Sequence, residues 1–345
     1  MKYIKSRLNK AEEYEKMQIL QVLLQLLLLV VGFVMLVKGA DWFVDGASKV
    51  AEIFGIPQLV IGLTIVAMGT SLPEAAVSTS AALKGSAEIT IGNVVGSNIM
   101  NILLILGITS VISPLAVQLS TIKYEIPMVI GASVLLAGLG LLDTTVGRID
   151  GIILLFGMVL YLLYLFKMAK KGQAEALEKE EAAEDSNNSG KKDSIIKQVL
   201  LILIGASLIV LGSNVTVDAA TELALIFGME ERIIGLTIVA FGTSLPELVT
   251  SATAAIKGKA DIAVGNIVGS NLFNLLFVVG IAAVITPVIY EKKFLVDTIV
   301  CIVSAILLWL CVIRTKKLKR SGGAILLLCY AAYFVYLMIS PFPLP

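Results

Sequence analysis

The sequence contains no histidine, and charged residues make up only 15% of its 345 positions. Without an imidazole, catalytic triads, zinc protease sites and histidine proton relays are excluded, so any proton chemistry falls to carboxylates. The 27 Lys and Arg nearly cancel the 26 Asp and Glu, a balance that argues against nucleic-acid binding. Cysteine is also scarce. Cys301, Cys311 and Cys329 lie in apolar stretches without CxxC spacing, which is typical of small core residues.

Apolar residues are abundant instead. They make up 57% of the chain, and the mean hydropathy is +0.93. Crossing a hydrocarbon layer of about 30 Å takes about 18 to 25 apolar residues. Runs that can do so occupy roughly residues 18–40, 56–83, 88–112, 125–142, 150–168, 195–217, 232–256, 261–285, 294–313 and 322–340. The sequence therefore predicts an all-α polytopic membrane protein with ten transmembrane helices.

Two polar segments flank the apolar spans, one before the first span and one between the fifth and the sixth. Residues 1–17 form a polar N-terminal extension that we expect to be retained, with Met17 as an alternative start, because the first span lacks the features of a cleaved signal. Residues 169–194 carry dense mixed charge and read as a solvated linker, too short for a folded regulatory domain. The predicted domains are thus 18–168 and 195–345, with five spans each.

The two domains are copies of one another. Residues 61–107 and 234–280 are identical at 29 of 47 positions at a constant offset of 173. Five is an odd number, so the second copy must enter the membrane from the opposite side, giving two inverted five-helix repeats. Lys and Arg are more numerous in the loops on the side of residues 169–194, which places this linker in the cytoplasm.

Each repeat interrupts an apolar helix, span 2 and span 7, with the motif GTSLPE, ending at Glu74 and at Glu247. Pro73 and Pro246 break the helix and free backbone carbonyls, which a membrane tolerates only inside protein or beside a watery cavity. A carboxylate at mid-membrane costs roughly 3 kcal/mol. We therefore expect a bound cation to neutralise the two glutamates.

Other oxygen-bearing side chains recur around the glutamates. Hydroxyls lie three and four residues before each one, on the same helical face, and the next span of each repeat carries GNxVGSNxxN. In that motif the glycines favour close helix packing, while Asn101 and Asn274 serve either as ligands or as interhelical hydrogen-bonding groups. An all-oxygen set without His or Cys suits hard cations such as Ca²⁺ or Na⁺. The candidate ligands from the two motifs are Thr70, Ser71, Ser97 and Asn101, and Thr243, Ser244, Ser270 and Asn274.

The paired GTSLPE and GNxVGSN motifs resemble the two alpha-repeats of the cation/calcium exchanger superfamily, in particular the prokaryotic sodium/calcium exchangers. The resemblance covers nearly the whole chain from the first span to the last. It implies an antiporter of a prokaryotic plasma membrane that exchanges several Na⁺ for one Ca²⁺ by alternating access, with spans 1 and 6 sliding against a rigid core. It also implies a site. Calcium would be bound by Glu74 and Glu247 with Thr70 and Thr243, and sodium by the carbonyls of Ala67 and Ala240 with Ser71, Ser244, Ser97 and Ser270.

One position departs from the family pattern. Many sodium/calcium exchangers have aspartate where this chain has Asn274, so the site charge here is −2. That charge balances one Ca²⁺ or two protons, whereas three Na⁺ would leave a costly positive site. A Ca²⁺/H⁺ antiporter on the same fold is therefore the alternative, although that branch typically carries an Asn-containing motif before its glutamate.

Other classes fit less well. A cation channel would normally be an oligomeric pore, and an enzyme would need catalytic groups that the chain lacks. We expect no cofactor and no obligate protein partner, and a functional monomer, because inverted repeats complete a transport unit within one chain.

Overall fold

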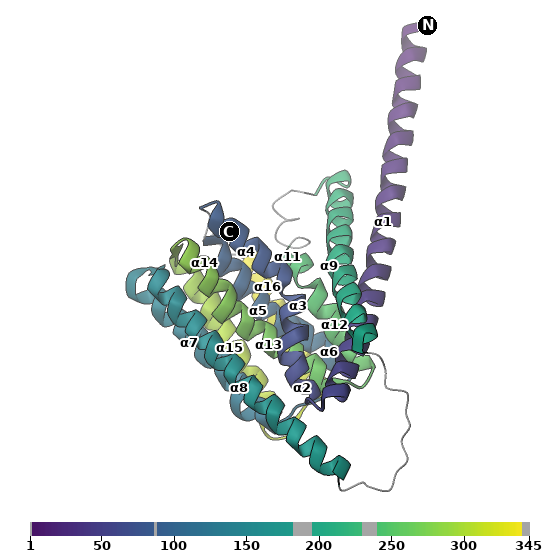
Figure 1. Ribbon diagram of the computed structural model, residues 1–345. Helices are drawn as coiled ribbons and strands as arrows, with labels where there is room; N and C mark the ends of the chain where they lie inside the picture. Colours follow the sequence, from purple (N-terminus) through teal and green to yellow (C-terminus); the bar gives the residue numbers. More distant parts are fainter. Residues whose placement is uncertain (1, 86–87, 182–194, 230–239, 340–345) are drawn as a thin grey trace.

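The protein is a bundle of helices, from which the N-terminal part of the first helix projects (Figure 1). The computed structural model describes residues 2–85, 88–181, 195–229 and 240–339. In the first half the elements are α1 (Lys2–Phe54), α2 (Gln58–Ile61), η1 (Gly62–Val66), α3 (Ala67–Thr70), α4 (Leu72–Leu83), α5 (Glu88–Ile99), η2 (Met100–Ile105), α6 (Leu106–Ile112), β1 (Leu115–Ala116), η3 (Thr121–Glu125), α7 (Ile126–Asp143), β2 (Thr145–Val146) and α8 (Arg148–Glu181). In the second half they are α9 (Ile195–Ile226), α11 (Ala240–Thr243), α12 (Leu245–Ile256), α13 (Ala260–Phe273), η5 (Asn274–Val278), α14 (Val279–Ile285), β3 (Val288–Ile289), α15 (Lys292–Ile313), β4 (Lys317–Leu318) and α16 (Arg320–Ile339).

Most of the predicted spans have a counterpart in the structure. In its described part, 8 helices are long and apolar enough to cross a membrane, or up to 9 if the pair Gln58–Thr70 and Leu72–Leu83, bent by 48°, is one span. The seventh predicted span, 232–256, lies partly outside the described residues, and its described remainder includes the shorter apolar helix α12. The protein is thus a predominantly helical membrane protein.

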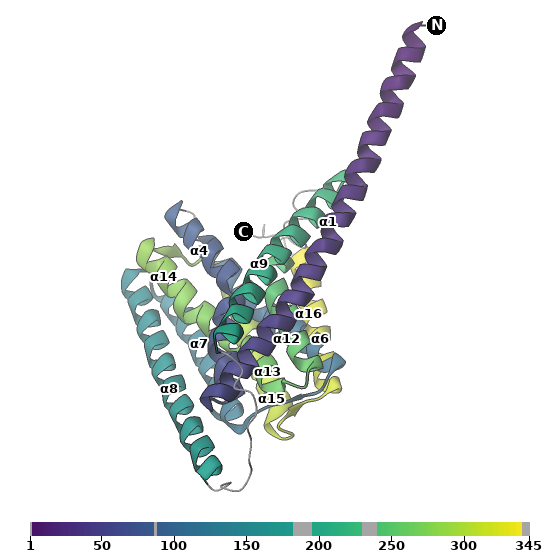
Figure 2. The ribbon, with the colours of Figure 1, turned by 45° about the vertical axis from the view of Figure 1, so that its right-hand side comes forward.

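Helices α1 and α9 lie side by side along much of their length (Figures 1 and 2). They run antiparallel, because Gly32 meets Gly212 and Gly39 meets Gly205. The backbones are in close contact: a Cβ atom at Gly39 would lie 2.8 Å from the carbonyl oxygen of Gly205. Small residues at helix contacts let backbones approach in a membrane. The offset of 173 converts each of these two contacts into the other, so α1 and α9 make equivalent contributions.

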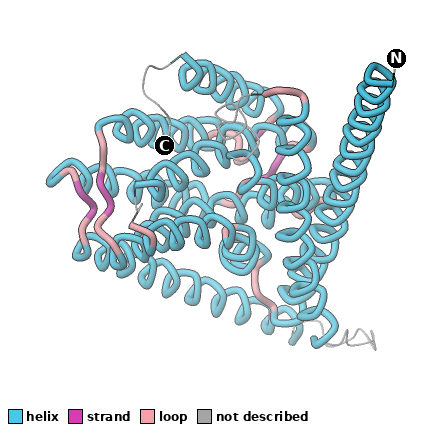
Figure 3. The backbone as a smooth tube through the Cα atoms, turned by 90° about the horizontal axis from the view of Figure 1, so that it is seen from above, coloured by secondary structure: helices cyan, strands magenta, loops and turns pink. Residues whose placement is uncertain are grey.

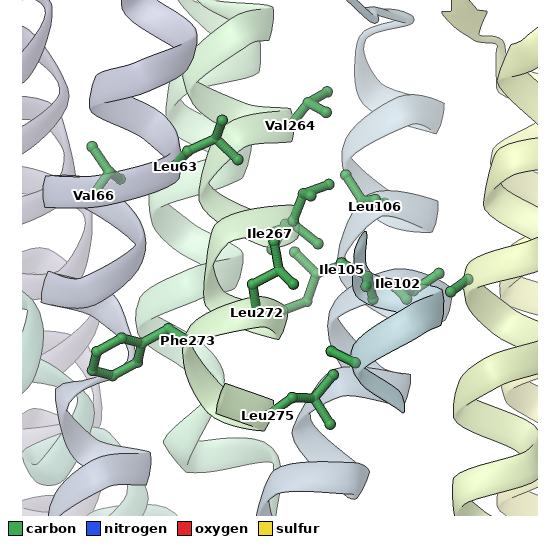
Figure 4. Close-up of a cluster of buried hydrophobic side chains, with 14 of the residues drawn as sticks. Leu63, Val66, Ile102, Ile105, Leu106, Val264, Ile267, Leu272, Phe273 and Leu275 are labelled. Carbon is green, nitrogen blue, oxygen red and sulfur yellow. The ribbon is translucent and has the colours of Figure 1, made fainter. Parts of the chain in front are cut away.

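Close packing also positions the bent helix of the first repeat. Helix α13 runs against α2, η1 and α3, and a Cβ atom at Gly269 would lie 2.7 Å from the carbonyl oxygen of Leu63. The close approach at Gly265 and Gly269 agrees with the packing role expected of the glycines in the GNxVGSN motif, whereas a Cβ atom at Gly96 would meet no described atom within 4 Å. Apolar side chains of η1, α13, η2 and α6 meet beside this contact and form part of the buried core (Figure 4).

Two short antiparallel strand pairs connect the halves. Leu115 of β1 pairs with Leu318 of β4, and Val146 of β2 pairs with Val288 of β3. In the view from above, one strand pair lies at the left edge of the bundle (Figure 3). At the offset of 173, β1 corresponds to β3, and β2 corresponds to residues 318–319, which overlap β4 by one residue, so each pair joins one strand from each repeat.

The charged segment after the fifth span is partly helical. The sequence predicts a solvated linker from residue 169, but α8 continues to Glu181. Residues 169–181 are rich in Ala, Glu and Lys, which favour helix, and Lys171 pairs with Glu175 one turn later at 3.8 Å. The rest of the segment, 182–194, lies outside the described residues.

Candidate cation site

The two GTSLPE motifs break their helices in the same way. Helix α3 ends at Thr70 and α4 begins at Leu72, with Ser71 between them at φ −86° and ψ 9°. In the second repeat Ser244 separates α11 from α12 at φ −92° and ψ 2°. Each proline lies in the first turn of the new helix, where its missing amide hydrogen costs little. Each glutamate is consequently in the first turn of the second half-helix.

Glu74 and Glu247 are both completely buried. Ser71 of the first repeat donates a hydrogen bond to Oε1 of Glu247 at 2.9 Å, and Ser97 donates to Oε1 of Glu74 at 3.4 Å. The two carboxylates lie close enough to repel each other electrostatically. The inverted packing of the halves has therefore brought together two acids that are 173 positions apart in the sequence.

Further contacts cross between the repeats beside the glutamates. The hydroxyl of Thr70 donates to Oδ1 of Asn266 at 3.0 Å, and that of Ser270 donates to the carbonyl oxygen of Ala67 at 3.3 Å. The amide of Asn266 in turn donates to Ser251 at 2.9 Å, as Asn93 does to Ser78 in the first repeat. These bonds place hydroxyl, amide and carbonyl oxygens around the breaks.

Four asparagines form a network at the centre of the molecule. Asn98 and Asn271 each donate to the other's backbone carbonyl, at 3.1 and 3.3 Å. The amide nitrogen of Asn101 donates to Oδ1 of Asn271 at 3.0 Å, and that of Asn274 donates to Oδ1 of Asn98 at 3.2 Å. The nitrogens of Asn101 and Asn274 are thus interhelical hydrogen-bond donors, which leaves their oxygens available.

Asn98 and Asn271 are not among the ligands predicted from the sequence. Their signal was present, because both repeats carry an asparagine at this position of an apolar span, where an unpaired amide would be costly. Nearby, the helices widen into π-turns: Asn101 lies in η2, and Asn274 is the first residue of η5. Such π-turns are frequent at functional sites.

Four buried carboxylate and amide oxygens at this centre have no hydrogen-bond partner among the described residues, and neither has the hydroxyl of Ser244. The four oxygens are Oε2 of Glu74, Oε2 of Glu247, Oδ1 of Asn101 and Oδ1 of Asn274. They form two equivalent pairs at the offset of 173. Buried acceptors of this kind are normally satisfied, so the set is suited to a bound cation.

The remaining predicted ligands are placed as follows. Thr70, Ser71, Ser97, Ser244 and Ser270 are buried, and Thr243 is half-buried at the end of α11. Ala67 is buried, while Ala240 begins α11. No cluster of three or more His, Cys, Asp or Glu that could hold a metal occurs in the described ranges. The negative charge at the centre thus comes from two glutamates alone.

An ion-pair cluster fastens α1 to the loop after α12. The ammonium of Lys257 lies 2.5 Å from Asp41 and 2.7 Å from Asp45, and Lys259 donates to Ser48 at 2.7 Å. Partial burial works to lower the pKa of Lys257, but the hydrogen bonds with Asp41 and Asp45 outweigh it and raise that pKa. At the equivalent position of the first repeat, Lys84 is exposed and forms no ion pair with any described residue.

Several known membrane proteins are similar to this chain over most of its length. The chain is 40% identical over 315 residues to the inner membrane protein YrbG of Escherichia coli K12, with 88% of this chain and 94% of the relative covered. It is 39% identical to the putative antiporter CaxA of Alkalimonas amylolytica, covering 92% and 100%. With the sodium/calcium exchanger MaX1 of Methanosarcina acetivorans it shares 30% identity, covering 90% and 97%.

Solved structures of a sodium-calcium exchanger match the fold of this chain. The structure of the sodium-calcium exchanger NCX_Mj matches with a TM-score of 0.78 and 32% identity, covering 92% of this chain and 99% of that one. A family model described as sodium/calcium exchanger protein matches twice, at residues 24–167 and 197–339. The chain belongs to the sodium/calcium exchanger protein family.

Proposed function

We propose that this protein is a secondary active antiporter that exchanges Na⁺ for Ca²⁺ across a membrane by alternating access. In this proposal Ca²⁺ binds at the centre between Glu74 and Glu247, with oxygens of Thr70, Thr243, Asn101 and Asn274 completing its coordination. Membership of the sodium/calcium exchanger family supports a cation/calcium antiporter. The coupling ion is the finer part of the proposal.

The observation that carries the proposal is the set of four unpartnered oxygens at the centre. Two belong to carboxylates and two to amides, and all are buried without water access. Calcium takes about six to eight oxygen ligands, and its double positive charge cancels the two glutamates. The asparagine network holds the amide oxygens free, which prepares the centre for a cation.

Sodium would occupy positions beside the calcium position. The carbonyls of Ala67 and Ala240 and the hydroxyls of Ser71, Ser97, Ser244 and Ser270 are the proposed ligands. The contact between Ser270 and the carbonyl oxygen of Ala67, at 3.3 Å, supports one such position, because both oxygens lie beside the broken helix. Na⁺ uses the same hard oxygen ligands as Ca²⁺.

For the architecture, we propose ten spans in two inverted repeats, 18–168 and 195–345, with 1–17 as an extension and 169–194 as a cytoplasmic linker. The symmetric contacts of α1 with α9 and of the strand pairs support the inversion. The transport unit is complete in one chain. Helices α1 and α9 would move together against the remaining helices, in a prokaryotic plasma membrane.

A Ca²⁺/H⁺ antiporter is the second candidate, and a specific observation favours it. Both Asn101 and Asn274 are amides, so the centre has the charge of two carboxylates only. Two protons or one Ca²⁺ neutralise that charge, whereas three Na⁺ exceed it by one.

Calcium flux into proteoliposomes under clamped voltage distinguishes the candidates. Vesicles loaded with Na⁺ are compared with vesicles loaded to the same osmolarity with choline at a more acidic internal pH. We expect the outward Na⁺ gradient to drive Ca²⁺ uptake and the outward proton gradient to leave uptake at background. Uptake driven only by the proton gradient would instead establish the Ca²⁺/H⁺ antiporter, and calcium currents without any counter-ion would indicate a channel.

A further inference from the structure

A third carboxylate is buried outside the cation site. The buried acids of the described chain are Glu74, Glu247 and Glu125, and each is 0% exposed. Glu125 is the last residue of the π-turn η3, near the beginning of the span Thr121–Asp143. The function proposed above does not use it.

The hydrogen bonding of Glu125 is incomplete. Tyr164 of α8 donates its hydroxyl hydrogen to Oε1 of Glu125, but Oε2 has no partner. The buried hydroxyl of Thr121, one turn earlier, lies close to the same carboxyl. No Lys or Arg forms an ion pair with Glu125 in the described structure. One oxygen of a completely buried carboxyl is therefore left without a positive charge or a hydrogen-bond partner among the described residues.

The surroundings of Glu125 are aromatic. Tyr161 lies close to the carboxyl and donates its hydroxyl hydrogen to the carbonyl oxygen of Leu63, at 3.4 Å. The ring of Tyr124 lies 6.2 Å from that of Tyr164, and Trp309 donates to the carbonyl oxygen of Ile122 at 2.9 Å. Leu63 belongs to η1, in the bent helix that also carries Thr70. The cluster thus contacts the helix of the cation site without sharing its ligands.

The three residues of the cluster have no identical counterparts in the second repeat, where a different pair occurs: Tyr333 of α16 donates to Oδ1 of Asp297 of α15 at 2.9 Å. At the offset of 173, Thr121 corresponds to Phe294, Glu125 to Thr298 and Tyr164 to Leu337. The cation site, by contrast, is built from residues that recur in both halves. Asp297 is only half-buried, so a completely buried acid at this place occurs in the first repeat alone among the described residues.

An ionised carboxylate with an unpaired oxygen is costly in a membrane interior. We propose that Glu125, with Thr121 and Tyr164, is a separate binding site for one monovalent positive charge, a proton or Na⁺. The site binds this charge reversibly. With it, the described chain has three completely buried carboxylates, enough to balance three monovalent cations where the centre alone balances two. This last consequence rests on the proposed antiport, whereas the binding itself does not.

Infrared spectroscopy of the purified full-length protein tests the binding directly, without transport. The variant Glu74→Gln/Glu247→Gln removes the central acids, and adding Glu125→Gln removes the third. Both are titrated with pH in a choline buffer, and the titration is repeated in NaCl. Glu222→Gln, at an exposed position of α9, is the matched control.

We expect the double variant to show the carbonyl band of a protonated, non-aqueous carboxylic acid that disappears reversibly as pH rises. The triple variant should lose one carboxyl equivalent of this band, and Glu222→Gln should retain it. Thr121→Val should shift the midpoint of the titration. Loss of the band at lower pH in NaCl than in choline would identify Na⁺ as a ligand, and the same midpoint in both salts would identify the proton alone.

Two results would overturn the inference. One is the absence of the band at every pH in choline, which would mean that the carboxyl is ionised without a bound charge. The other is a band that persists unchanged until the protein unfolds, which would make Glu125 a permanently neutral structural acid. If the double variant is too unstable to purify, the same comparison is made between the wild type and Glu125→Gln. Failure of sodium-driven flux would not alter either reading, because these spectra do not depend on exchange.

Discussion

The hydroxyl of Ser71 donates a hydrogen bond to Glu247 at 2.9 Å, although the two residues lie 176 positions apart and in different repeats. Ser71 is the residue at which the helix of the first repeat breaks. The break therefore orients a donor toward the acid of the other repeat. The proposed cation site forms only where the halves pack against each other.

Replacing either central glutamate should abolish calcium binding. In Glu74→Gln or Glu247→Gln, one charge is removed while shape and burial are retained. Breaking a buried charge interaction costs about 3–5 kcal/mol, so we expect calcium affinity to fall by more than about 100-fold. Calorimetric calcium titration and flux into proteoliposomes measure this. Glu222→Gln is the control, and wild-type flux in either central variant would show that the site is assigned to the wrong residues.

The two serines that contact the glutamates should differ in importance. Ser71→Ala leaves Oε1 of Glu247 without its donor, and a hydrogen bond to a charged group contributes about 1.5–3 kcal/mol. Ser97→Ala removes a longer contact, of 3.4 Å against 2.9 Å. We expect Ser71→Ala to impair sodium-driven calcium exchange more strongly, measured from initial rates across a range of Na⁺ concentrations. Equal effects would contradict the geometry.

Replacing Asn274 by aspartate should change the number of Na⁺ ions coupled to each Ca²⁺. In Asn274→Asp the formal charge of the centre becomes −3, which balances three monovalent cations. We therefore expect a steeper dependence of calcium release on Na⁺ concentration than in the wild type. The new carboxylate also loses the amide donor to Asn98, so thermal stability must be measured in parallel. An unchanged Hill coefficient in a folded variant argues that the charge at this position does not set the stoichiometry.

A larger side chain at the contact between α1 and α9 should destabilise the protein. A Cβ atom in Gly39→Ala would meet the carbonyl oxygen of Gly205 at 2.8 Å, and such overpacking costs about 1–3 kcal/mol. Gly138 of α7 is the matched control, because a Cβ atom there meets no atom of the described structure within 4 Å. Gly138→Ala should be neutral or stabilising, since alanine favours helix by about 1 kcal/mol. Thermal unfolding in detergent compares the two.

The Lys257 cluster gives a pH dependence with a definite sign. Because the folded state raises the pKa of Lys257 above its ordinary 10.5, the stabilisation is fully present below that value and is lost as pH rises through the higher folded value. Lys257→Met should therefore lower stability by about 0.2–1 kcal/mol at neutral pH, the range of partly exposed ion pairs. The difference from wild type should vanish in strongly alkaline solution. Lys84→Met, at the equivalent position, should have no comparable effect on stability. A similar loss of stability in Lys84→Met would show that the effect of Lys257→Met comes from replacing lysine by methionine and not from the lost ion pairs.

The sequence by itself determined the elements of the site. The repeated GTSLPE motifs located both helix breaks and both acids, because proline and a membrane-embedded carboxylate have few alternative uses. The absence of histidine limited the chemistry to hard oxygen ligands. Boundaries were less well defined: α8 runs on to Glu181, since the charged residues that indicated a linker also favour helix.

Only the tertiary structure decided which of these oxygens meet. Ser71 shares a helical face with Glu74 yet bonds Glu247, and the paired Asn98 and Asn271 hold the amides of Asn101 and Asn274 so that their oxygens stay free. Within the first repeat, Tyr164 and Glu125 also meet only through tertiary packing, since they lie on different helices and no motif connects them. Sequence periodicity fixes the face on which a side chain lies. Contacts between residues more than a hundred positions apart depend instead on how the two repeats pack, and no local pattern encodes that.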